Sequence, residues 1–468
     1  MAEKPKHPHL GLAQYPLLLT LEPEGLGLGG QVLELAGPDE VHVHQKDGIL
    51  ICDDFLLGQC PEGERCPRHH TPKPFHWQMR RRKDGVWLSV GMSAQQHLEK
   101  LYCSTSHDDV QLVDKAGSSW TLNLSSIQLK SFQVYDHVRR LSNSSDPSCN
   151  LYFFVEWQMY WEEYGEWLKY KEPLQSELLA AFEKGMWNHA FKLGDQLYNV
   201  NLKQLTQRNV RTGFTRRIRC RPKWRPPWRL VPKLQRVLGT TINSSSNIPG
   251  EAPQNNYCGP YPASWVPNAS QGTMYTLAAV APAEMAYQTT CELFHKTLAE
   301  DKALVLGIYR VRNDYLWQKY RGQKKFMAQC RRPRARYGLE KHLFHGTLAS
   351  NVQPICEMNF DPRLAGVNGM AYGQGSYFAS DASYSHHYAK PGEAGLRHMF
   401  LVKVLVGRSV QGKSKFRQPP LARDGRLYDS CTDCAKNPKI FVLFDNCQCY
   451  PYFLIRYKLL SEPVTMDL

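Results

Sequence analysis

Long hydrophobic runs are missing from this sequence. The apolar stretch at residues 15–21 is far too short to cross a bilayer, and no later stretch approaches the about 18 apolar residues of a membrane-spanning helix. The start lacks the basic residues, apolar segment and cleavage site of a secretory signal, and neither end carries a lipidation motif. We therefore expect a protein that is not secreted, has no membrane partner and works in the nucleus, the cytoplasm or both.

Acidic residues are too few to balance the basic ones. The 468 residues include 58 Lys and Arg against 43 Asp and Glu, which gives a formal net charge of +15. Such an excess favours polyanionic partners: nucleic acid, a dinucleotide cofactor or a phosphate-rich polymer. In the reducing compartment expected above, the 14 cysteines are predicted to be thiols or metal ligands and not disulfides.

The chain is too long for one ordinary hydrophobic core, so two to four domains are expected. A helical period at 281–299 is followed by apolar strand patterns, which indicates an α+β multidomain protein. The predicted strands are at 399–407, 440–445 and 452–460. The predicted segments are an irregular start with a short strand near 32–35 (1–48), a Cys/His cluster (49–73), two loosely similar Trp-rich segments (75–148 and 150–221), a linker (222–256) and an α+β domain (257–468).

Four metal-ligand residues stand close together in the Cys/His cluster. They are Cys52, Cys60, Cys66 and His70, with the spacing C-x7-C-x5-C-x3-H. Three thiolates and one imidazole form the tetrahedral shell of a structural zinc. The residues between them are too polar to fold without such a staple. The spacing resembles that of CCCH zinc fingers, so one structural Zn²⁺ is predicted, with His69 as the alternative to His70.

The sequence does not decide what this finger binds, nor whether a second group of cysteines binds a metal. CCCH fingers often bind single-stranded RNA through stacking aromatics, and Phe55 is the aromatic inside this one. RNA is therefore one expected partner, and a small protein-contact module is the alternative. In the second group the C-x-C pair falls at a strand edge, where alternate side chains point to opposite faces. Free thiols are thus favoured there over a second zinc site, and the residues are Cys431, Cys434, Cys447 and Cys449.

The second Trp-rich segment resembles a WWE domain over about 70 residues, from FFVEWQMYWEEYGEWLKY to GFTRRIR. In WWE domains that bind iso-ADP-ribose or a terminal ADP-ribose, two Tyr, a Gln and an Arg line the pocket. The resemblance carries these roles to Tyr170, Tyr198, Gln207 and Arg217. Aromatic rings suit adenine, an amide suits polar base edges and a guanidinium suits phosphate. ADP-ribose, or an end of poly(ADP-ribose), is therefore the partner expected for this segment.

The first Trp-rich segment is similar enough to be a degenerate copy of the second. It runs from PFHWQMRRRKDGVWLSVG to WTLNLSSIQL. Trp120 stands where the Tyr of the first strand is expected, and Leu129 falls where the Gln is expected. This copy is therefore predicted to pack without binding a ligand.

Short motifs follow one another through the last part of the chain: YPASWVP, RVRNDYLWQKY, LFHGT, GQGSYFASDASYSHHY and IFVLFD. Their layout resembles the catalytic domain of the poly(ADP-ribose) polymerase family. The resemblance implies an ADP-ribosyltransferase fold with a split antiparallel sheet, and NAD as the co-substrate. The GQG at 373–375 is not a dinucleotide fingerprint, because no βαβ pattern surrounds it.

The same resemblance assigns a role in NAD binding to each of five residues. His345 holds a ribose hydroxyl, and Gly346 leaves room for the nicotinamide amide to reach the backbone. Ser385 gives that amide a hydroxyl contact. Tyr388 stacks on the nicotinamide ring, with Tyr377 packed nearby. Fixing the bent dinucleotide supplies much of the rate, since departure of nicotinamide leaves a ribose with oxocarbenium character.

One catalytic position departs from the polymer-forming members of the family. These have a Glu directly before the strand that corresponds to Phe441–Asp445, and this chain has Ile440. An aliphatic side chain neither contacts the ribose 2′-hydroxyl nor orients an incoming ADP-ribose for chain growth. Because His345 is retained, transfer of single ADP-ribose units to acceptor proteins, including the chain itself, is predicted. The alternative is an inactive ADP-ribose- or RNA-binding protein, for instance if the loop 361–372 blocks the cleft.

Overall fold

The computed structural model describes residues 45–46, 48–57, 60–131, 134–150, 153–226, 274–330, 338–364 and 370–466. These residues belong to two compact units, one formed by the residues up to 226 together with 463–466, the other by 274–462. The predicted strand near 32–35, most of the linker and the start of the predicted C-terminal domain lie outside the described residues. Within the described ranges, no helix is long and apolar enough to span a bilayer.

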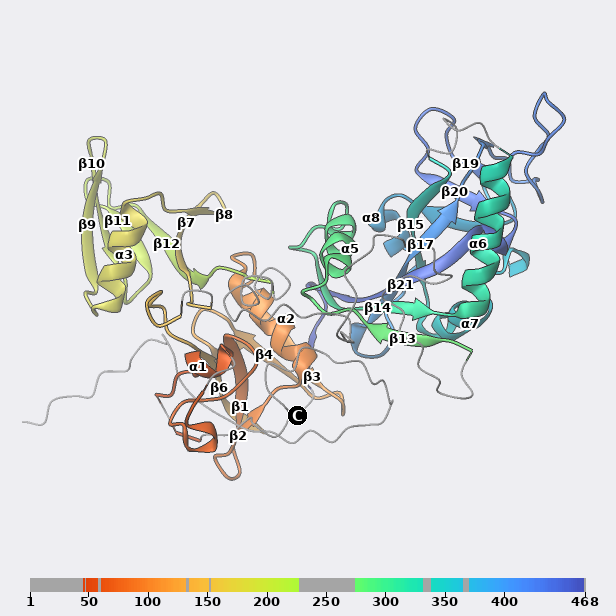
Figure 1. The fold of residues 1–468 in the computed structure, drawn as a ribbon. Helices are drawn as coiled ribbons and strands as arrows, with labels where there is room; N and C mark the ends of the chain where they lie inside the picture. The colour runs from red at the N-terminus through yellow and green to blue at the C-terminus, as the bar shows by residue number, and fades with distance from the viewer. Residues whose placement is uncertain are drawn as a thin grey trace, which may run out of the picture. The chain divides into compact units, whose positions relative to one another are not determined.

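The first unit begins with the Cys/His cluster, which contains the short helix α1 (Asp53–Leu56) and a 3₁₀ turn at Gly63–Arg65. Two stretches of six strands and one helix follow (Figure 1), which we call the first and the second repeat. The first repeat consists of β1 (Phe75–Arg81), β2 (Trp87–Ser89), α2 (Met92–Cys103), β3 (Asp109–Asp114), β4 (Ser119–Asn123), β5 (Gln128–Leu129) and β6 (Tyr135–Ser142). The second repeat consists of β7 (Trp157–Glu163), β8 (Glu166–Lys169), α3 (Leu174–Glu183), β9 (Asn188–Leu193), β10 (Gln196–Asn201), β11 (Thr206–Asn209) and β12 (Thr215–Pro222).

The two repeats have the same strand order. The second repeat forms one sheet in the order β8-β7-β12-β11-β10-β9. The first repeat has the corresponding order but forms two sheets, β2-β1-β6 and β5-β4-β3, because β5 and β6 do not share a ladder. The loose similarity between the two Trp-rich segments is thus matched by a shared topology.

A strand from the end of the chain completes the second sheet of the first repeat. β22 (Val464–Met466) pairs in parallel with β3, with Val464 opposite Leu112. Val464 and Met466 are both buried there. The predicted α+β domain of 257–468 therefore includes a terminal strand that belongs to the other unit. Sequence pattern does not reveal this, since a three-residue strand whose partner lies about 350 residues away has no local signal.

The first repeat packs α2 on β1 around a buried ion pair. Trp77 is fully buried, and its indole Nε1 donates to the Glu99 carboxylate at 3.0 Å. Arg140, from β6, donates to the same carboxylate through Nε at 2.8 Å and Nη2 at 2.7 Å. All three side chains are buried, so each charge is compensated and each polar atom of the carboxylate has a partner.

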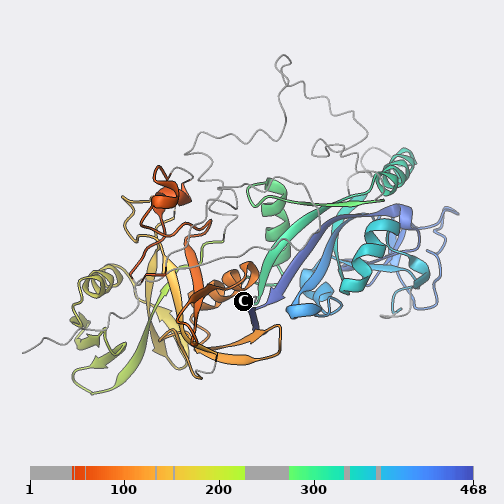
Figure 2. The same ribbon diagram turned by 90° about the horizontal axis from the view of Figure 1, so that it is seen from below.

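The second unit is a nine-stranded sheet with four α-helices among its described residues, and its long central strands run side by side (Figure 2). The sheet order is β13-β14-β21-β17-β15-β16-β20-β19-β18. All its neighbours are antiparallel except β18 and β19. The strands are β13 (Thr276–Ala279), β14 (Ala303–Arg312), β15 (Glu340–Thr347), β16 (Ser376–Ala379), β17 (Arg397–Leu405), β18 (Ser409–Gln411), β19 (Ser430–Thr432), β20 (Ile440–Leu443) and β21 (Cys449–Leu459), and the helices are α5 (Met285–His295), α6 (Asp314–Gln329), α7 (Val352–Met358) and α8 (Ala382–His386).

The sheet of the second unit has a weak seam between two groups of strands. β15 and β16 share one register pair, Phe344 with Ala379, whereas β15 and β17 share eight. β15 thus separates from β16 beyond that pair, at the end that carries the predicted catalytic histidine. The predicted helix and the three predicted strands are confirmed, with shifted ends, as α5, β17, β20 and β21. Mixed α/β content with mainly antiparallel sheets is also confirmed.

Candidate functional site

His345 lies at the point where β15 and β16 separate. Its Nδ1 donates to the main-chain carbonyl of Tyr377 at 2.8 Å, and its ring packs edge-on against Phe360 with centroids 4.7 Å apart. Burial lowers the pKa of the imidazole below its ordinary value, although the bond to the carbonyl opposes this shift. With the proton held on Nδ1, the neutral ring presents Nε2 as a hydrogen-bond acceptor.

Four tyrosines lie close to one another, and one of them, Tyr377, is bonded to His345 through its main chain. The Tyr377 hydroxyl donates to the Gly373 carbonyl at 2.8 Å. The hydroxyls of Tyr384 and Tyr388 lie 3.3 Å apart. Burial raises the pKa of Tyr384, and so do the nearby phenols of Tyr388, Tyr372 and Tyr377. The structure therefore brings the predicted Tyr377 and Tyr388 to one place, together with two tyrosines that the sequence reasoning missed.

The position of Tyr384 was nonetheless recoverable from the sequence. It precedes Tyr388 by four residues in ASYSHHY, and residues four apart lie on one face of a helix. Tyr384 belongs to α8 (Ala382–His386), and the turn that follows the helix places the ring of Tyr388 5.7 Å from that of Tyr384.

Gly346 is required for a reason that the sequence reasoning did not include. A Cβ built on Gly346 would lie 1.8 Å from the main-chain oxygen of Ser385 and 2.9 Å from the nitrogen of Ala389. The glycine therefore lets the backbone of β15 approach that of α8, and any side chain would force the two apart. Ser385 itself is buried at this contact, so the structure does bring Gly346 and Ser385 together.

Ile440 lies on β20, on the same face of the β16–β20 pair as Tyr377. Its register partner is Ala379, and Tyr377 pairs with Val442. Because register partners and residues two apart in a strand point to the same face, the four side chains share one face. Ile440 is buried, and its main-chain nitrogen donates to Asp433 Oδ1 at 3.1 Å. The side chain at this place is therefore held in a fixed, apolar position next to the tyrosine cluster.

The four predicted metal ligands come together in the first unit. One ligand atom from each of Cys52, Cys60, Cys66 and His70 lies within 4.8 Å of the others. The Cys52 sulfur accepts a hydrogen bond from the main-chain nitrogen of Phe55 at 3.4 Å. The donor set of three sulfurs and one imidazole fits a tetrahedral zinc. His69 is not part of this group, and its ring lies 4.7 Å from that of His76.

Phe55 is buried beneath the finger instead of being exposed on it. Its ring stacks on His70 with centroids 4.1 Å and planes 19° apart, and 5% of the residue is exposed. A nucleic-acid base therefore cannot stack on Phe55 in this arrangement. The Phe55 ring packs against His70, a predicted metal ligand, which is a structural role.

The cysteines of the second group differ in how deeply they are buried. Cys431 and Cys449 are buried, whereas Cys434 is exposed and Cys447 is half-buried. Burial raises the pKa of Cys431 to about 11. The Cys449 thiol donates to Asn359 Oδ1 at 3.6 Å and to the Asn446 carbonyl at 3.5 Å. The buried thiols of Cys431 and Cys449 therefore keep their protons at neutral pH, which suits packing.

Three of the four residues predicted to line an ADP-ribose pocket lie together in the second repeat. The Tyr170 hydroxyl donates to Gln207 Oε1, and both residues are 5% exposed. Phe191 links them to the third residue: its ring stacks on Tyr198 with centroids 5.3 Å apart and meets Tyr170 edge-on. The amide and the two phenols therefore share one face of the sheet.

The structure does not bring Arg217 to this group, and that prediction is wrong. Arg216, and not Arg217, is the register partner of Gln207, so Arg216 shares its face. Arg216 is close enough to oppose the rise that burial causes in the pKa of Tyr170. Arg217 points to the other face, where it donates to Glu162 at 2.7 and 2.8 Å. Strand alternation decides the matter, because neighbouring residues face opposite ways.

The corresponding positions of the first repeat are filled by apolar side chains. Trp120 is buried and meets Tyr135 edge-on, with ring centroids 5.3 Å apart. Leu129 is buried opposite Leu122, just as Gln207 lies opposite Val200. In register, Leu129 thus matches Gln207, as predicted. Trp120 matches Tyr198, on the fourth strand of the second repeat, and not the predicted Tyr of the first strand.

Two family models match the chain. Residues 285–459 match the poly(ADP-ribose) polymerase catalytic domain, and residues 155–220 match the WWE domain. The first match contains His345, the tyrosine cluster and Ile440. The second match contains the Tyr170, Tyr198, Gln207 and Arg216 group.

Named relatives cover most of the chain. The protein mono-ADP-ribosyltransferase PARP12 of Homo sapiens is 31% identical over 444 residues, which cover 90% of this chain and 59% of that protein. The protein mono-ADP-ribosyltransferase PARP11 of Mus musculus is 33% identical over 283 residues, which cover 56% of this chain and 77% of that protein. The mouse PARP10, with the same descriptive name, is 36% identical over 180 residues, 37% of this chain and 18% of that protein. The chain spans about three-fifths of the length of PARP12.

Proposed function

Because the chain belongs to the poly(ADP-ribose) polymerase family, we propose that it is an NAD-dependent protein mono-ADP-ribosyltransferase. Its substrates are NAD and acceptor proteins, including the chain itself. The names of PARP12, PARP11 and PARP10 support single-unit transfer. The observation that carries the proposal is the meeting of His345, Tyr377, Ser385 and Tyr388 at the seam between β15 and β16.

The proposed reaction breaks the bond between nicotinamide and the ribose carbon. Nicotinamide leaves with the bonding electrons, which neutralise its pyridinium charge, and a lone pair of the acceptor side chain attacks the same carbon. The acceptor then loses its proton. Tyr388 stacks on the nicotinamide ring with Tyr377 packed nearby, and the backbone next to Gly346 holds the amide, so that orientation lowers the barrier.

The neutral state of His345 matches the role proposed for it. Its Nδ1 proton is engaged by the Tyr377 carbonyl, so Nε2 accepts the proton of a ribose hydroxyl. Burial depresses the pKa of the imidazole, so this acceptor persists at neutral pH and is lost by protonation at a pH below the ordinary histidine pKa of about 6.5.

Ile440 supports the limit to one ADP-ribose unit. The side chain shares a face with Tyr377 and is buried next to it, and it carries no hydrogen-bonding group. Growth of a polymer requires a group that orients the hydroxyl of a bound ADP-ribose as the next acceptor. An aliphatic side chain at this place leaves transfer to a protein acceptor as the outcome.

Two further parts of the proposal concern the first unit. Cys52, Cys60, Cys66 and His70 would hold a structural Zn²⁺, which would supply the cohesion that this short polar segment lacks. The pocket residues of the second repeat would bind ADP-ribose, with Arg216 as the phosphate partner in place of Arg217. A nuclear or cytoplasmic location is also proposed, since none of the 13 cysteines among the described residues forms a disulfide.

The proposed transfer is tested by incubating the purified chain with labelled NAD and examining the products by gel and mass spectrometry. We expect a sharp labelled band with single ADP-ribose units. H345A should reduce labelling at least about a hundredfold, because the ribose loses its positioning partner. H342A, on the exposed end of the same strand, is the matched control and should label normally.

Each other result of that experiment has a definite meaning. A high-mass smear of polymer would contradict the argument from Ile440. Labelling that persists in H345A would contradict the site assignment. No labelling, combined with binding of ADP-ribose or RNA, would favour an inactive binding protein.

A further inference from the structure

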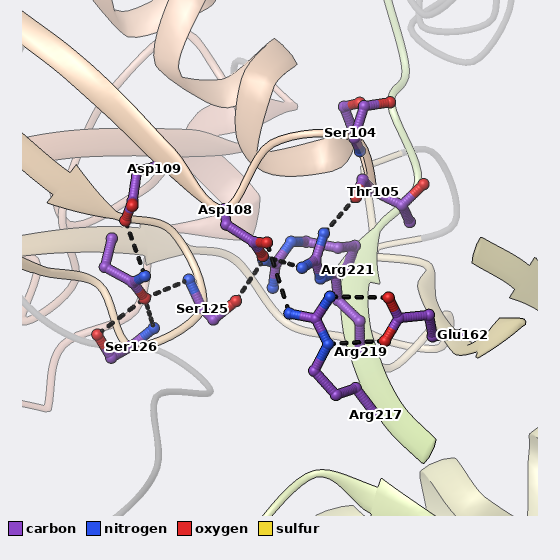
Figure 3. Close-up of polar contacts among 12 residues, drawn as sticks. Ser104, Thr105, Asp108, Asp109, Ser125, Ser126, Glu162, Arg217, Arg219 and Arg221 are labelled. Atoms are coloured by element: carbon purple, nitrogen blue, oxygen red, sulfur yellow. Dashed lines mark hydrogen bonds and ion pairs between the residues drawn. The ribbon is translucent and has the colours of Figure 1, made fainter. Parts of the chain in front are cut away.

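The two faces of strand β12 have different surroundings. Arg216 and Ile218 face the pocket side of the second repeat, with Arg216 opposite Gln207. Arg217, Arg219 and Arg221 alternate with them and therefore face the opposite side. Figure 3 shows these three arginines close to two loops of the first repeat, one with Thr105 and Asp108 and one with Ser125.

The contacts between these two loops and the three arginines are polar and partly buried. Arg219 is 3% exposed, and its guanidinium donates both to the Thr105 carbonyl and to Asp108 Oδ1 (Figure 3). Arg217 Nη1 lies 3.6 Å from Asp108 Oδ2. Arg221, which is also buried, donates through Nη2 to Ser125 Oγ at 3.1 Å. The first repeat thus contacts Arg217, Arg219 and Arg221 of β12.

Asp108 is the charged residue of the first repeat in these contacts. Its carboxylate lies against two of the three guanidiniums, and its side chain is 49% exposed, so it is held there by the arginines themselves. Burial, together with the nearby Arg221, lowers the pKa of Arg219 to about 10, and Asp108 counteracts this loss of the charged form. Without the carboxylate, a buried guanidinium would lose its counter-charge.

We propose that Asp108 of the first repeat is a positioning residue for ADP-ribose binding by the second repeat, acting through β12. The inference rests on the binding proposed above for the second repeat. Arg216 and Arg217 are adjacent in the backbone, so a shift of β12 that relieves the uncompensated Arg219 also displaces the Arg216 guanidinium. A charged hydrogen bond to phosphate loses strength with small errors in position.

The proposal gives the first repeat a function although its own pocket positions are filled. It holds the strand that carries the phosphate partner of the second repeat. Trp167 reinforces the arrangement, because the Arg219 guanidinium lies 3.9 Å above its ring. The two repeats are therefore expected to act as one binding module.

The test measures the Kd of free ADP-ribose by calorimetry on the full chain. D108N keeps the size of the side chain and removes its charge, and should weaken binding about tenfold. D108E restores a carboxylate and should recover most of the affinity. The matched control is D84N, which removes an exposed acid of the first repeat that pairs with Arg81 at 2.5 Å and lies away from β12. D84N should bind as the wild type does.

Hydrogen exchange separates positioning from a loss of fold. D108N should speed exchange in β12 and its neighbours β7 and β11, with no change in β1 or α2. If D108N binds as tightly as D84N, the inference is wrong. It is equally wrong if D108E binds as weakly as D108N while exchange rises throughout the first unit. If the wild type does not bind ADP-ribose, the binding proposed for the second repeat fails, and this inference fails with it.

Discussion

The first and second repeats share one strand order but place different chemistry on the same face. In the second repeat, Tyr170, Tyr198, Gln207 and Arg216 occupy four positions of that face. Equivalent register positions of the first repeat hold Val90, Trp120 and Leu129. The position of Arg216 falls at a β-bulge, where Asp136 pairs with Arg80 on the opposite face. One fold thus presents either polar or apolar side chains at the same positions, and a few residues decide which.

The first repeat buries its charged side chains at another place. Its Glu99–Arg140 pair, with the Trp77 indole, lies between α2 and β1. In the second repeat the place of Arg140 is taken by Cys220, since both are paired with equivalent positions of β1 and β7. The first repeat is therefore a structural support whose stability depends on a compensated buried charge, and the second keeps its polar groups for a ligand.

The largest effect is expected from breaking the support. E99Q leaves the buried Arg140 without its counter-charge, which should cost about 3–5 kcal/mol in the free energy of unfolding. The control is E156Q, since Glu156 pairs with Lys223 on the exposed surface at 2.7 Å and should contribute less than about 1 kcal/mol. Urea unfolding followed by tryptophan fluorescence compares the two variants. Equal stability of E99Q and E156Q would contradict the role given to the buried pair.

The next largest effect is expected at Arg216. R216A removes the proposed phosphate partner and should raise the Kd of ADP-ribose about thirtyfold, since a hydrogen bond to a charged group contributes about 2 kcal/mol. R217A removes a neighbouring side chain that faces Glu162 and should change the Kd less than about threefold. A larger loss in R217A than in R216A would return the pocket to the arrangement predicted from sequence.

A smaller effect is expected when the second repeat is given a residue of the first. Q207L introduces the leucine that the first repeat carries at Leu129 and leaves the Tyr170 hydroxyl without its acceptor. Binding of ADP-ribose should weaken about tenfold, the value of one buried hydrogen bond. Q204L, at an exposed turn position, is the control and should bind normally. Undiminished binding by Q207L would show that the amide does not read the ligand.

The sequence predicted residue types better than it predicted faces. Motif order located His345, Tyr377, Ser385 and Tyr388, which the structure brings together. The error at Arg217 arose because a shift of one residue in a strand reverses the face, and the register is set by pairing with β11. Pairings between distant segments, such as β22 with β3, depend on tertiary structure and leave no periodic pattern in the sequence.

The smallest effect, no gain at all, is expected from the reverse exchange in the first repeat. W120Y/L129Q restores two of the four polar positions, and binding is best measured in an R216A background that weakens the second repeat. Two obstacles remain: Val90 offers no phenol at the place of Tyr170, and the position of Arg216 falls at a β-bulge where Asp136 pairs with Arg80 on the opposite face. The hydrogen bonds from Arg80 lower the pKa of Asp136 to about 2, so its carboxylate is charged and stays paired with Arg80 at neutral pH.

Titration of ADP-ribose against W120Y/L129Q/R216A should therefore match R216A alone. Adding V90Y and D136R supplies the missing phenol and guanidinium, and a measurable gain should appear only then. A β-bulge between Arg80 and Arg81 lies beside Asp136 and turns its side chain towards Arg80, so even this gain is expected to be partial. If W120Y/L129Q alone gave binding, the affinity for ADP-ribose would depend on the tyrosine and glutamine positions, those of Tyr198 and Gln207, more than on the charge of Arg216.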